Sequence, residues 1–163
     1  MFYLDSYIVI SFNYQLQVMT NITCIPQVTD KSLLLSILHS IKHSVIFNVD
    51  QFPTLADKAG HLWYMLARYQ VFNNGNKRTA IISTLAFLML NRYKVDFTNK
   101  DITENLYELT KLVGQDKCSE KDLVKFLNDN MKSSKENVMP EDMVSYFLKQ
   151  KNLKDILFKL AEE

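Results

Sequence analysis

The sequence predicts an all-α protein of about six to eight helices. Three glycines and three prolines among 163 residues leave few obligatory turns, which argues against a fold built from many short strands. Apolar residues recur at helical spacing in several segments, and the run Ala80–Leu90 is apolar on every side of a helix. With 47% hydrophobic and 23% charged residues, the composition is that of a folded chain with a sizeable core.

The first two predicted helices lie before residue 43. Residues 3–18 are apolar with a mixed pattern and predict the first helix, which is followed by a loop containing Pro26. Thr29 or Asp30 is expected to cap a second helix over residues 31–42, because either side chain can accept from the unpaired N–H groups of a first turn. The expected core-facing stripe of this helix consists of Leu34, Leu35, Leu38 and Ile41.

A short extended segment separates the second helix from the third. Residues 43–53 are β-branched and aromatic, which predicts a small hairpin or an extended flap. Pro53 fits the first turn of a helix that starts near Thr54 and runs over residues 55–71. One face of that helix is apolar and consists of Ala59, Leu62, Trp63, Leu66 and Ala67.

Three further helices are predicted over residues 79–92, 101–114 and 119–131. The first should be buried nearly all round, because its apolar residues occupy all sides. Gly114 is expected to end the second helix, and residues 119–122 resemble a capping box with aspartate in place of glutamate.

The end of the chain predicts a C-terminal helical extension, residues 131–163, to a main domain of residues 1–130. Residues 132–137 form a polar link, and the remainder reads as one or two helices broken near Asn152. The apolar residues of this extension favour packing on the domain's own core, and the alternative is a dimer or partner surface. They are Met143, Phe147, Leu153, Ile156, Leu157 and Leu160.

Charge and cysteine content narrow the classes of partner and compartment. The formal net charge of +1 provides no strong field for nucleic acid or a membrane surface, so neither is expected as a partner. Cys24 and Cys118 match no metal or redox spacing, which favours unpaired thiols in a reducing cytosol. The apolar N-terminus carries Asp5 and no basic residue before Lys31, and Ala80–Leu90 is shorter than the roughly 20 residues that span a bilayer. A cytoplasmic location is therefore expected.

The polar, basic stretch RYQVFNNGNKRTA, residues 68–80, stands between two apolar segments. A loop that enters a helix presents unpaired backbone N–H groups at the positive end of the helix dipole, and this arrangement binds anions. Gly75 permits a positive φ there, whereas Lys77 and Arg78 are disfavoured at this end unless an anion binds. The plainer alternative is a solvated turn with two surface bases, and the spacing is not that of a Walker loop.

Residues 53–97 resemble the Fic/Doc family, in particular its Doc (death-on-curing) branch, within a wider resemblance over residues 4–130. The family motif H-x-F-x-[D/E]-G-N-[G/K]-R reads QVFNNGNKR here, at residues 70–78. The resemblance implies an all-α fold whose motif loop joins two core helices. It also implies transfer of a phosphoryl group, or of part of a nucleotide, from ATP or another nucleoside triphosphate with Mg²⁺ to a protein hydroxyl.

The Doc branch implies a more specific activity. Its toxins are kinases of the translation elongation factor Tu, and they carry lysine, as at Lys77, where nucleotidyl-transferring relatives carry glycine. One expected setting is therefore a toxin–antitoxin pair with a separate antitoxin chain, and a homodimer stays open as a further partnership.

The resemblance also implies roles for single residues. Phe72 should anchor the loop in the core. The flap of residues 43–52, represented by His43, Val45 and Phe47, should hold the target peptide as an added strand. Phosphate or nucleotide binding is expected of Asn73, Gly75, Asn76, Lys77 and Arg78.

Two positions depart from the family motif. Gln70 stands where the family histidine acts as general base, and a carboxamide can orient a hydroxyl but cannot take its proton. Asn74 stands where a family carboxylate holds Mg²⁺, and its neutral oxygen is a weaker ligand. His61 cannot replace the base on a continuous helix, because nine residues place it on the opposite face and about 13 Å from Gln70. His43 could approach from the flap.

Three functions are compatible with these residues. The chain is a working Doc-like transferase, a pseudoenzyme that binds a nucleotide or a partner, or a partner-binding helical module that has lost the nucleotide as well. No intrinsic inhibitory helix is evident, because Lys100 and Lys132 stand where the inhibitory motif of the family has Ser or Thr before Glu-Asn or Glu-Gly.

Overall fold

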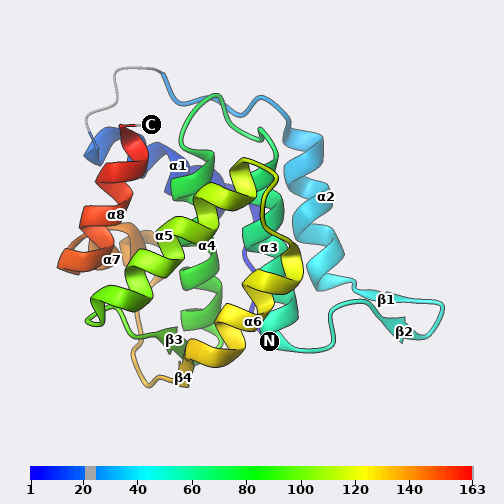
Figure 1. Ribbon diagram of the computed structural model, residues 1–163. Coiled ribbons are helices and arrows are strands. Elements are labelled where there is room, and N and C mark those ends of the chain that lie inside the picture. The colour runs from blue at the N-terminus through cyan, green and yellow to red at the C-terminus, as the bar shows by residue number, and fades with distance from the viewer. Residues whose placement is uncertain (21–24, 163) are drawn as a thin grey trace.

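The computed structural model describes residues 1–20 and 25–162 and confirms the all-α class (Figure 1). Its strands form two short antiparallel ladders: β1 (Val45–Ile46) pairs with β2 (Val49–Asp50), and β3 (Tyr93–Val95) pairs with β4 (Met131–Ser133). A 3-10 helix, η1, covers Pro140–Asp142. The α-helices in the described ranges are α1 (Ser6–Met19), α2 (Lys31–Lys42), α3 (Leu55–Arg68), α4 (Asn76–Leu90), α5 (Lys100–Gly114), α6 (Glu120–Asn130), α7 (Met143–Leu148) and α8 (Lys151–Ala161).

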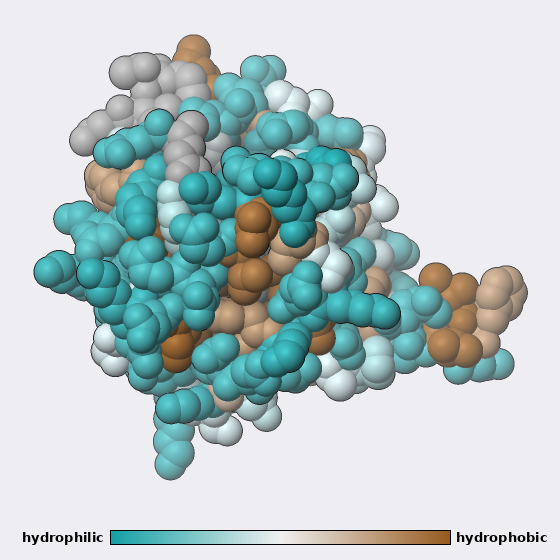
Figure 2. Space-filling model, viewed as in Figure 1, coloured by the Kyte–Doolittle hydropathy of each residue, from teal (hydrophilic) through white to brown (hydrophobic). Residues whose placement is uncertain are grey.

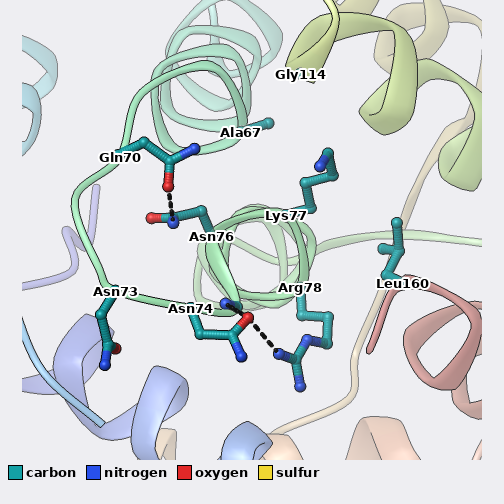
Figure 3. A pocket seen from close by; sticks show the side chains of 10 residues that line it. Ala67, Gln70, Asn73, Asn74, Asn76, Lys77, Arg78, Gly114 and Leu160 are labelled. Atoms are coloured by element: carbon teal, nitrogen blue, oxygen red, sulfur yellow. Dashed lines mark hydrogen bonds between the residues drawn. The ribbon is translucent and has the colours of Figure 1, made fainter. Parts of the chain in front are cut away.

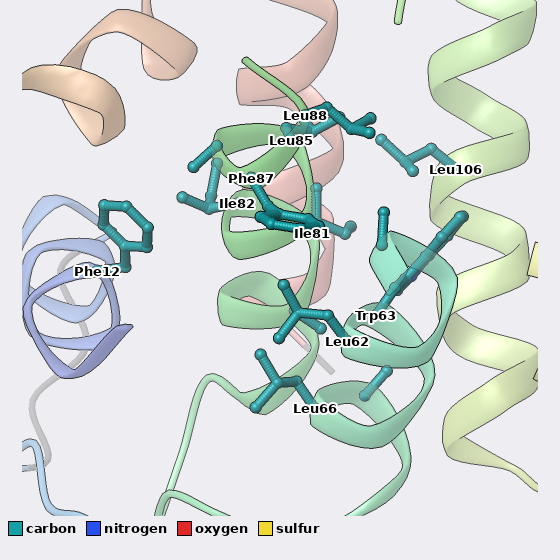
Figure 4. Packing of buried hydrophobic residues seen from close by; sticks show 14 of the residues in the cluster. Phe12, Leu62, Trp63, Leu66, Ile81, Ile82, Leu85, Phe87, Leu88 and Leu106 are labelled. Atoms are coloured by element: carbon teal, nitrogen blue, oxygen red, sulfur yellow. The ribbon is translucent and has the colours of Figure 1, made fainter. Parts of the chain in front are cut away.

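Helix α4 is the central helix, and α1, α3, α5, α7 and α8 pack around it. Every residue from Arg78 to Met89 is buried, which confirms the prediction of a helix covered on all sides. Figure 4 shows Phe12 of α1, Leu66 of α3 and Leu106 of α5 beside α4, and all three side chains are buried. The residues after the motif loop therefore form the axis of one continuous hydrophobic core.

Side chains cap the helices largely where the sequence predicts. Asp30, rather than Thr29, caps α2, and its carboxylate accepts a first-turn N–H at 3.0 Å. Thr54 and Asp57 form a full capping box at the start of α3, where no capping residue was predicted. The predicted capping box at residues 119–122 is confirmed at the start of α6.

Three boundaries differ from the prediction. Helix α3 ends at Arg68 instead of continuing to residue 71, because Tyr69 turns to an extended conformation with φ −108° and ψ 152°. Pro53 precedes the N-cap of α3 and so lies outside the first turn. The break in the C-terminal helices is at residues 149–150, and Asn152 lies inside α8, where its amide donates to two backbone carbonyls before α5.

The apolar stripe of α2 is narrower than predicted. Leu34, Ile37 and Ile41 are buried, and their spacing of three and four residues keeps them on one side of the helix. Leu35 is one residue further round the helix and is 48% exposed, so its inclusion in the stripe was wrong.

The C-terminal segment shares the core of the rest of the chain. Strand β4 begins directly after α6 and pairs with β3, while α8 packs on α5 and α4. All six of its apolar side chains predicted to face the core are buried, from Met143 to Leu160. These residues therefore cover the domain's own core.

The hairpin of β1 and β2 projects from the end of α2 and is apolar on its surface (Figures 1 and 2). Val45, Ile46 and Val49 are each more than half exposed, and Phe47 at its tip is 96% exposed. Its base is tied down by the buried Lys58, whose Nζ donates to the Ile41 carbonyl and the Ser44 hydroxyl. The hairpin thus has a fixed base and an exposed apolar tip.

No helix within residues 1–20 and 25–162 is both long and apolar enough to cross a membrane. Cys118 is a free, partly buried thiol, and burial raises its pKa to about 11, which makes it a poor nucleophile at neutral pH. Cys24, the other predicted free thiol, lies outside the described residues.

Candidate phosphate-binding site

The site is built where α3 ends and α4 begins. Between them, residues 69–75 form a loop, and Gly75 stands at the N-cap of α4 with φ 77°. A β-carbon at Gly75 would lie 3.1 Å from Arg78 Nη2 and 3.1 Å from Asn13 Nδ2. Both the backbone angle and the space therefore favour glycine, as the sequence predicts.

A pocket of about 140 Å³ lies at the N-terminus of α4 (Figure 3). No side chain caps this helix end. Within the described chain, the backbone N–H groups of Asn76 and Lys77 have no acceptor, and they lie at the positive end of the helix dipole. The pocket is therefore suited to an anion. It is lined by Ala67, Gln70, Asn73, Asn74, Gly75, Asn76, Lys77, Arg78, Gly114 and Leu160.

Lys77 and Arg78 are adjacent in sequence, but the first side chain lies at the pocket surface and the second is buried. Lys77 is partly exposed at the pocket, and its Nζ has no hydrogen-bond or ion-pair partner among residues 1–20 and 25–162. Arg78 is 2% exposed and reaches inward, where Nη1 donates to Thr20 Oγ1 at 2.6 Å and Nη2 to Asn74 Oδ1 at 3.4 Å. Lys77 is thus the cation with uncommitted donors, while Arg78 adds positive charge from within the core.

Asn76 holds the loop in shape. Its Nδ2 donates to the backbone carbonyl of Phe72 and to Gln70 Oε1, both at 2.9 Å, and its Oδ1 accepts the Phe72 N–H at 2.9 Å. Phe72 itself is 1% exposed and lies in the core. Because its side chain is used in this way, Asn76 can offer an anion mainly its backbone N–H.

Gln70 presents a hydrogen-bond donor to the pocket. Its Oε1 is occupied by Asn76, and its amide nitrogen points away from that contact, on the side of Ala67 (Figure 3). A carboxamide nitrogen donates hydrogen bonds and accepts no proton near neutral pH. Gln70 can therefore bind an anion's oxygen or orient a hydroxyl group, and it cannot serve as a general base.

The side chain of Asn74 is engaged within the loop. Its Oδ1 accepts from the Gly75 N–H at 2.7 Å and from Arg78 at 3.4 Å, and its backbone carbonyl accepts from Asn13 Nδ2 at 2.8 Å. The carbonyl oxygen that would bind a cation already faces a guanidinium. No group of three or more His, Cys, Asp or Glu side chains suited to a metal occurs in the described part of the chain.

Residues 25–29 lie beside the loop. Asn73 donates its N–H to the Gln27 carbonyl at 3.0 Å and its Nδ2 to the Ile25 carbonyl at 2.8 Å. Val28 forms an antiparallel bridge with Phe72. Asn73 thus contributes to the pocket wall while holding this neighbouring segment.

The structure does not bring the predicted flap to the pocket. His43, Val45 and Phe47 lie in and before the β1–β2 hairpin, which precedes α3, whereas the pocket follows α3 (Figure 1). A helix of 14 residues separates the two by roughly 20 Å, so these residues cannot hold a peptide at the pocket. Residues 25–29, which were not predicted to belong to the site, lie beside the loop instead.

The three histidines make contacts away from Gln70, so none of them takes the place of the family's general base. His61 Nδ1 contacts Glu120 Oε1 at 2.8 Å, and its ring stacks on Phe52 at 4.3 Å. The rings of His39 and His43 contact each other at a tilt of 35°, with centroids 4.5 Å apart, at the hairpin end of α2. The continuous helix on which the exclusion of His61 rested ends at Arg68, and it is the contacts of the His61 ring with Glu120 and Phe52 that direct it away from Gln70.

Several residues of the site were missed in the sequence. Asn13 and Gln17 are buried polar residues of α1, and Asn13 Nδ2 also donates to Thr79 Oγ1 at 3.1 Å. Their signal is a pair of polar residues four apart on the apolar face of a helix. Gly114 and Leu160 have no such signal, because only the packing of α5 and α8 brings them to the pocket.

Comparison with known proteins adds one match. A sequence model of the protein family described as the Fic/DOC family matches residues 4–88, which is more than half of the 163 residues. The matched segment contains the whole loop and the start of α4, and it excludes Gly114 and Leu160. A search of curated proteins found no match.

Proposed function

The chain belongs to the Fic/DOC family, and from that premise we propose that its loop at residues 70–78 binds the phosphates of a nucleoside triphosphate such as ATP. One observation carries the proposal. Among the residues that the structure describes, the N–H groups of Asn76 and Lys77 at the start of this buried helix have no acceptor, and Lys77 Nζ, also without a partner there, lies at the same pocket. The pocket of about 140 Å³ is smaller than the 300 Å³ or more of sites that enclose whole drug-sized ligands, so it suits phosphates better than a complete nucleotide.

The proposed reaction is the Doc-like one: transfer of the terminal phosphoryl group to a hydroxyl of a cytosolic protein, with elongation factor Tu as the first candidate. The hydroxyl oxygen forms a bond to phosphorus, the bond to the nucleoside diphosphate breaks, and the hydroxyl proton passes to solvent. Phosphoryl transfer through a loose transition state depends chiefly on position and charge neutralisation. Gln70 would orient the hydroxyl, and Lys77 would neutralise phosphate charge.

The residues present do not fit a protein-held Mg²⁺. The pocket lining contains no carboxylate, and Asn74 Oδ1 already accepts from the Gly75 N–H and faces Arg78. A divalent cation at that oxygen would be repelled by the guanidinium. The proposal therefore assigns no step to a metal held by the protein.

The proposed target would lie along residues 25–29. These residues already bridge the loop at Val28 and Phe72, and Ile25 is 84% exposed. An extended peptide beside them would bring a hydroxyl close to Gln70. An antitoxin chain is a proposed second partner.

A second function is favoured by the chemistry of two side chains. With Gln70 unable to take a proton and Asn74 engaged with Arg78, the site binds anions better than it catalyses. The chain would then be a Fic-fold module that binds a nucleotide, or a partner that presents a phosphate, without transfer.

Labelling with ATP distinguishes these functions. Purified chain is incubated with elongation factor Tu, or with bacterial lysate, and ATP labelled at either the α or the γ phosphate. A protein band labelled from γ alone supports the kinase, and a band labelled from α indicates nucleotidyl transfer. If both are silent while ATP still binds, and the double variant Gln70→His with Asn74→Asp is active, the binding module is supported. Failure of ATP to bind at all contradicts the kinase and the nucleotide-binding module, and leaves only a partner that presents a phosphate.

A further inference from the structure

Gly114 ends α5, but the backbone there does not need glycine. The C-cap is Gln115, and Gly75 is the glycine with positive φ in the described chain. The residue with a left-handed angle after α5 is Asp116, at φ 59°. A glycine inside a helix is less favourable than alanine by about 1 kcal/mol, so a different reason for Gly114 is required.

The reason is that the Lys77 side chain passes through the space that a side chain at position 114 would occupy. A β-carbon at Gly114 would lie 2.5 Å from Lys77 Cε and 3.4 Å from Lys77 Nζ, so any other residue would have to displace the lysine. Gly60, in comparison, would meet Val124 Cγ2 at 2.5 Å, which is ordinary close packing of α3 on α6. The space at Gly114 is filled by a single flexible cation.

The electrostatic setting points the same way. Lys77 lies in the first turn of α4, where the positive helix end disfavours an ammonium group. Its Nζ is close to Gly114, at the negative C-terminal end of α5. The end of α5 therefore offsets the unfavourable field of α4 at the ammonium group. Figure 3 shows Gly114 above Lys77.

We propose that Gly114 is a positioning residue for Lys77: the gap left by its missing side chain holds Nζ over the pocket, where it binds phosphate. This inference rests on the proposed function, since it names what places the phosphate-binding cation. Gly114 lies outside residues 4–88, the segment that the family model matches.

The test is a double-mutant cycle with ATP as the ligand, measured by calorimetry. Gly114→Ala is expected to weaken ATP binding by about tenfold or more, the effect of losing one charge-assisted hydrogen bond. In the Lys77→Met background the same substitution should have no further effect. Gln115→Ala, at the exposed neighbouring position on the same helix end, is the matched control and should bind like the wild type. An equal loss from Gly114→Ala in both backgrounds, or no loss in either, overturns the inference.

A second readout needs no ligand. Lysines are reductively methylated with ¹³C, and the Lys77 resonance is identified by its absence in Lys77→Met. Gly114→Ala should shift that resonance and Gln115→Ala should not, with thermal melting as the check on folding. An unmoved Lys77 resonance overturns the contact. If wild-type chain binds no ATP, the proposed function and the phosphate role fail, and this resonance still decides whether Gly114 places Lys77.

Discussion

The side-chain amide of Asn13 donates a hydrogen bond of 2.8 Å to the backbone carbonyl of Asn74 and so ties α1 to the loop of residues 69–75. The same amide reaches Thr79, and its oxygen accepts from Gln17 at 2.7 Å. Asn13 is 2% exposed. One buried side chain therefore joins three parts of the site.

Replacement of Asn13 should loosen the loop. Asn13→Ala leaves buried partners unpaired, and we expect a loss of about 1–3 kcal/mol in the free energy of unfolding, measured with urea. ATP binding should weaken as well, because the loop loses its support from α1. Tyr14→Ala, at the next position and 57% exposed, is the control and should change neither quantity much. Stability equal to that of the control would contradict the role of Asn13.

Gly75 is expected to tolerate no side chain without loss. Gly75→Ala forces an L-residue to φ 77° and should lower the free energy of unfolding by about 1–2 kcal/mol. Gly75→Asn should lose less, because asparagine adopts the left-handed region more readily. Urea unfolding of the three chains measures the order. An alanine variant as stable as the wild type would show that the loop relaxes to another conformation.

Phe47 occupies a left-handed position at φ 49°, although the ring is 96% exposed and gains no burial there. Asparagine is better suited to such a turn position. Phe47→Asn should therefore raise the free energy of unfolding by about 0.5–1 kcal/mol. The comparison is Val49→Asn, in a strand, which should give no gain. A destabilised Phe47→Asn chain would mean that the ring makes a contact important to the fold.

The hydrogen bond between Tyr146 and Glu136 should make the thermal stability of the chain depend on pH. The Tyr146 hydroxyl donates to Glu136 and lowers the pKa of that carboxyl, and Lys94 at 3.1 Å lowers it further. Because the folded pKa is depressed, this stabilisation is present above pH 4.5 and is lost as the pH falls through the folded value. Tyr146→Phe should flatten the loss of thermal stability below pH 4.5.

At alkaline pH the stability contributed by this pair changes in the opposite direction and falls as the pH rises. Burial, and then Glu136, raise the pKa of Tyr146 to about 12, so its stabilisation is complete below pH 10 and is lost as the pH rises toward 12. Melting temperatures measured below pH 4.5 and between pH 10 and 12 test both predictions. Tyr7→Phe, at a tyrosine that is 79% exposed, should follow the wild type. Parallel curves for Tyr146→Phe and the wild type would contradict the prediction.

The helices were predictable because their signals are local. Capping residues such as Asp30 and Ser119 act within four residues, and the run after the loop is apolar on every side. The end of α3 was not predictable in this way. Val71 continues the apolar pattern, but its backbone carbonyl accepts a hydrogen bond from the N–H of Thr29, more than forty residues earlier. Long-range pairing of this kind overrides helical periodicity.

The floor of the pocket was predictable for the same reason, since residues 70–78 are contiguous. The role of the hairpin was predicted wrongly because it was taken from the resemblance, although a long helix between the hairpin and the loop already places them far apart. Gly114 shows the second limit. Its position suggested a helix stop, and helix α5 does end there, yet its missing side chain leaves room for a lysine 37 residues earlier in the chain.

The pocket has a floor and a wall of different origin. Residues 70–78 form the floor and lie within the family match, whereas Gly114 and Leu160 form part of the wall and lie beyond it. The family match therefore covers the loop of the pocket and leaves out the two helices that complete its lining. Substitutions at Gly114 in α5 and Leu160 in α8 would reshape the pocket without changing any residue that the family match covers.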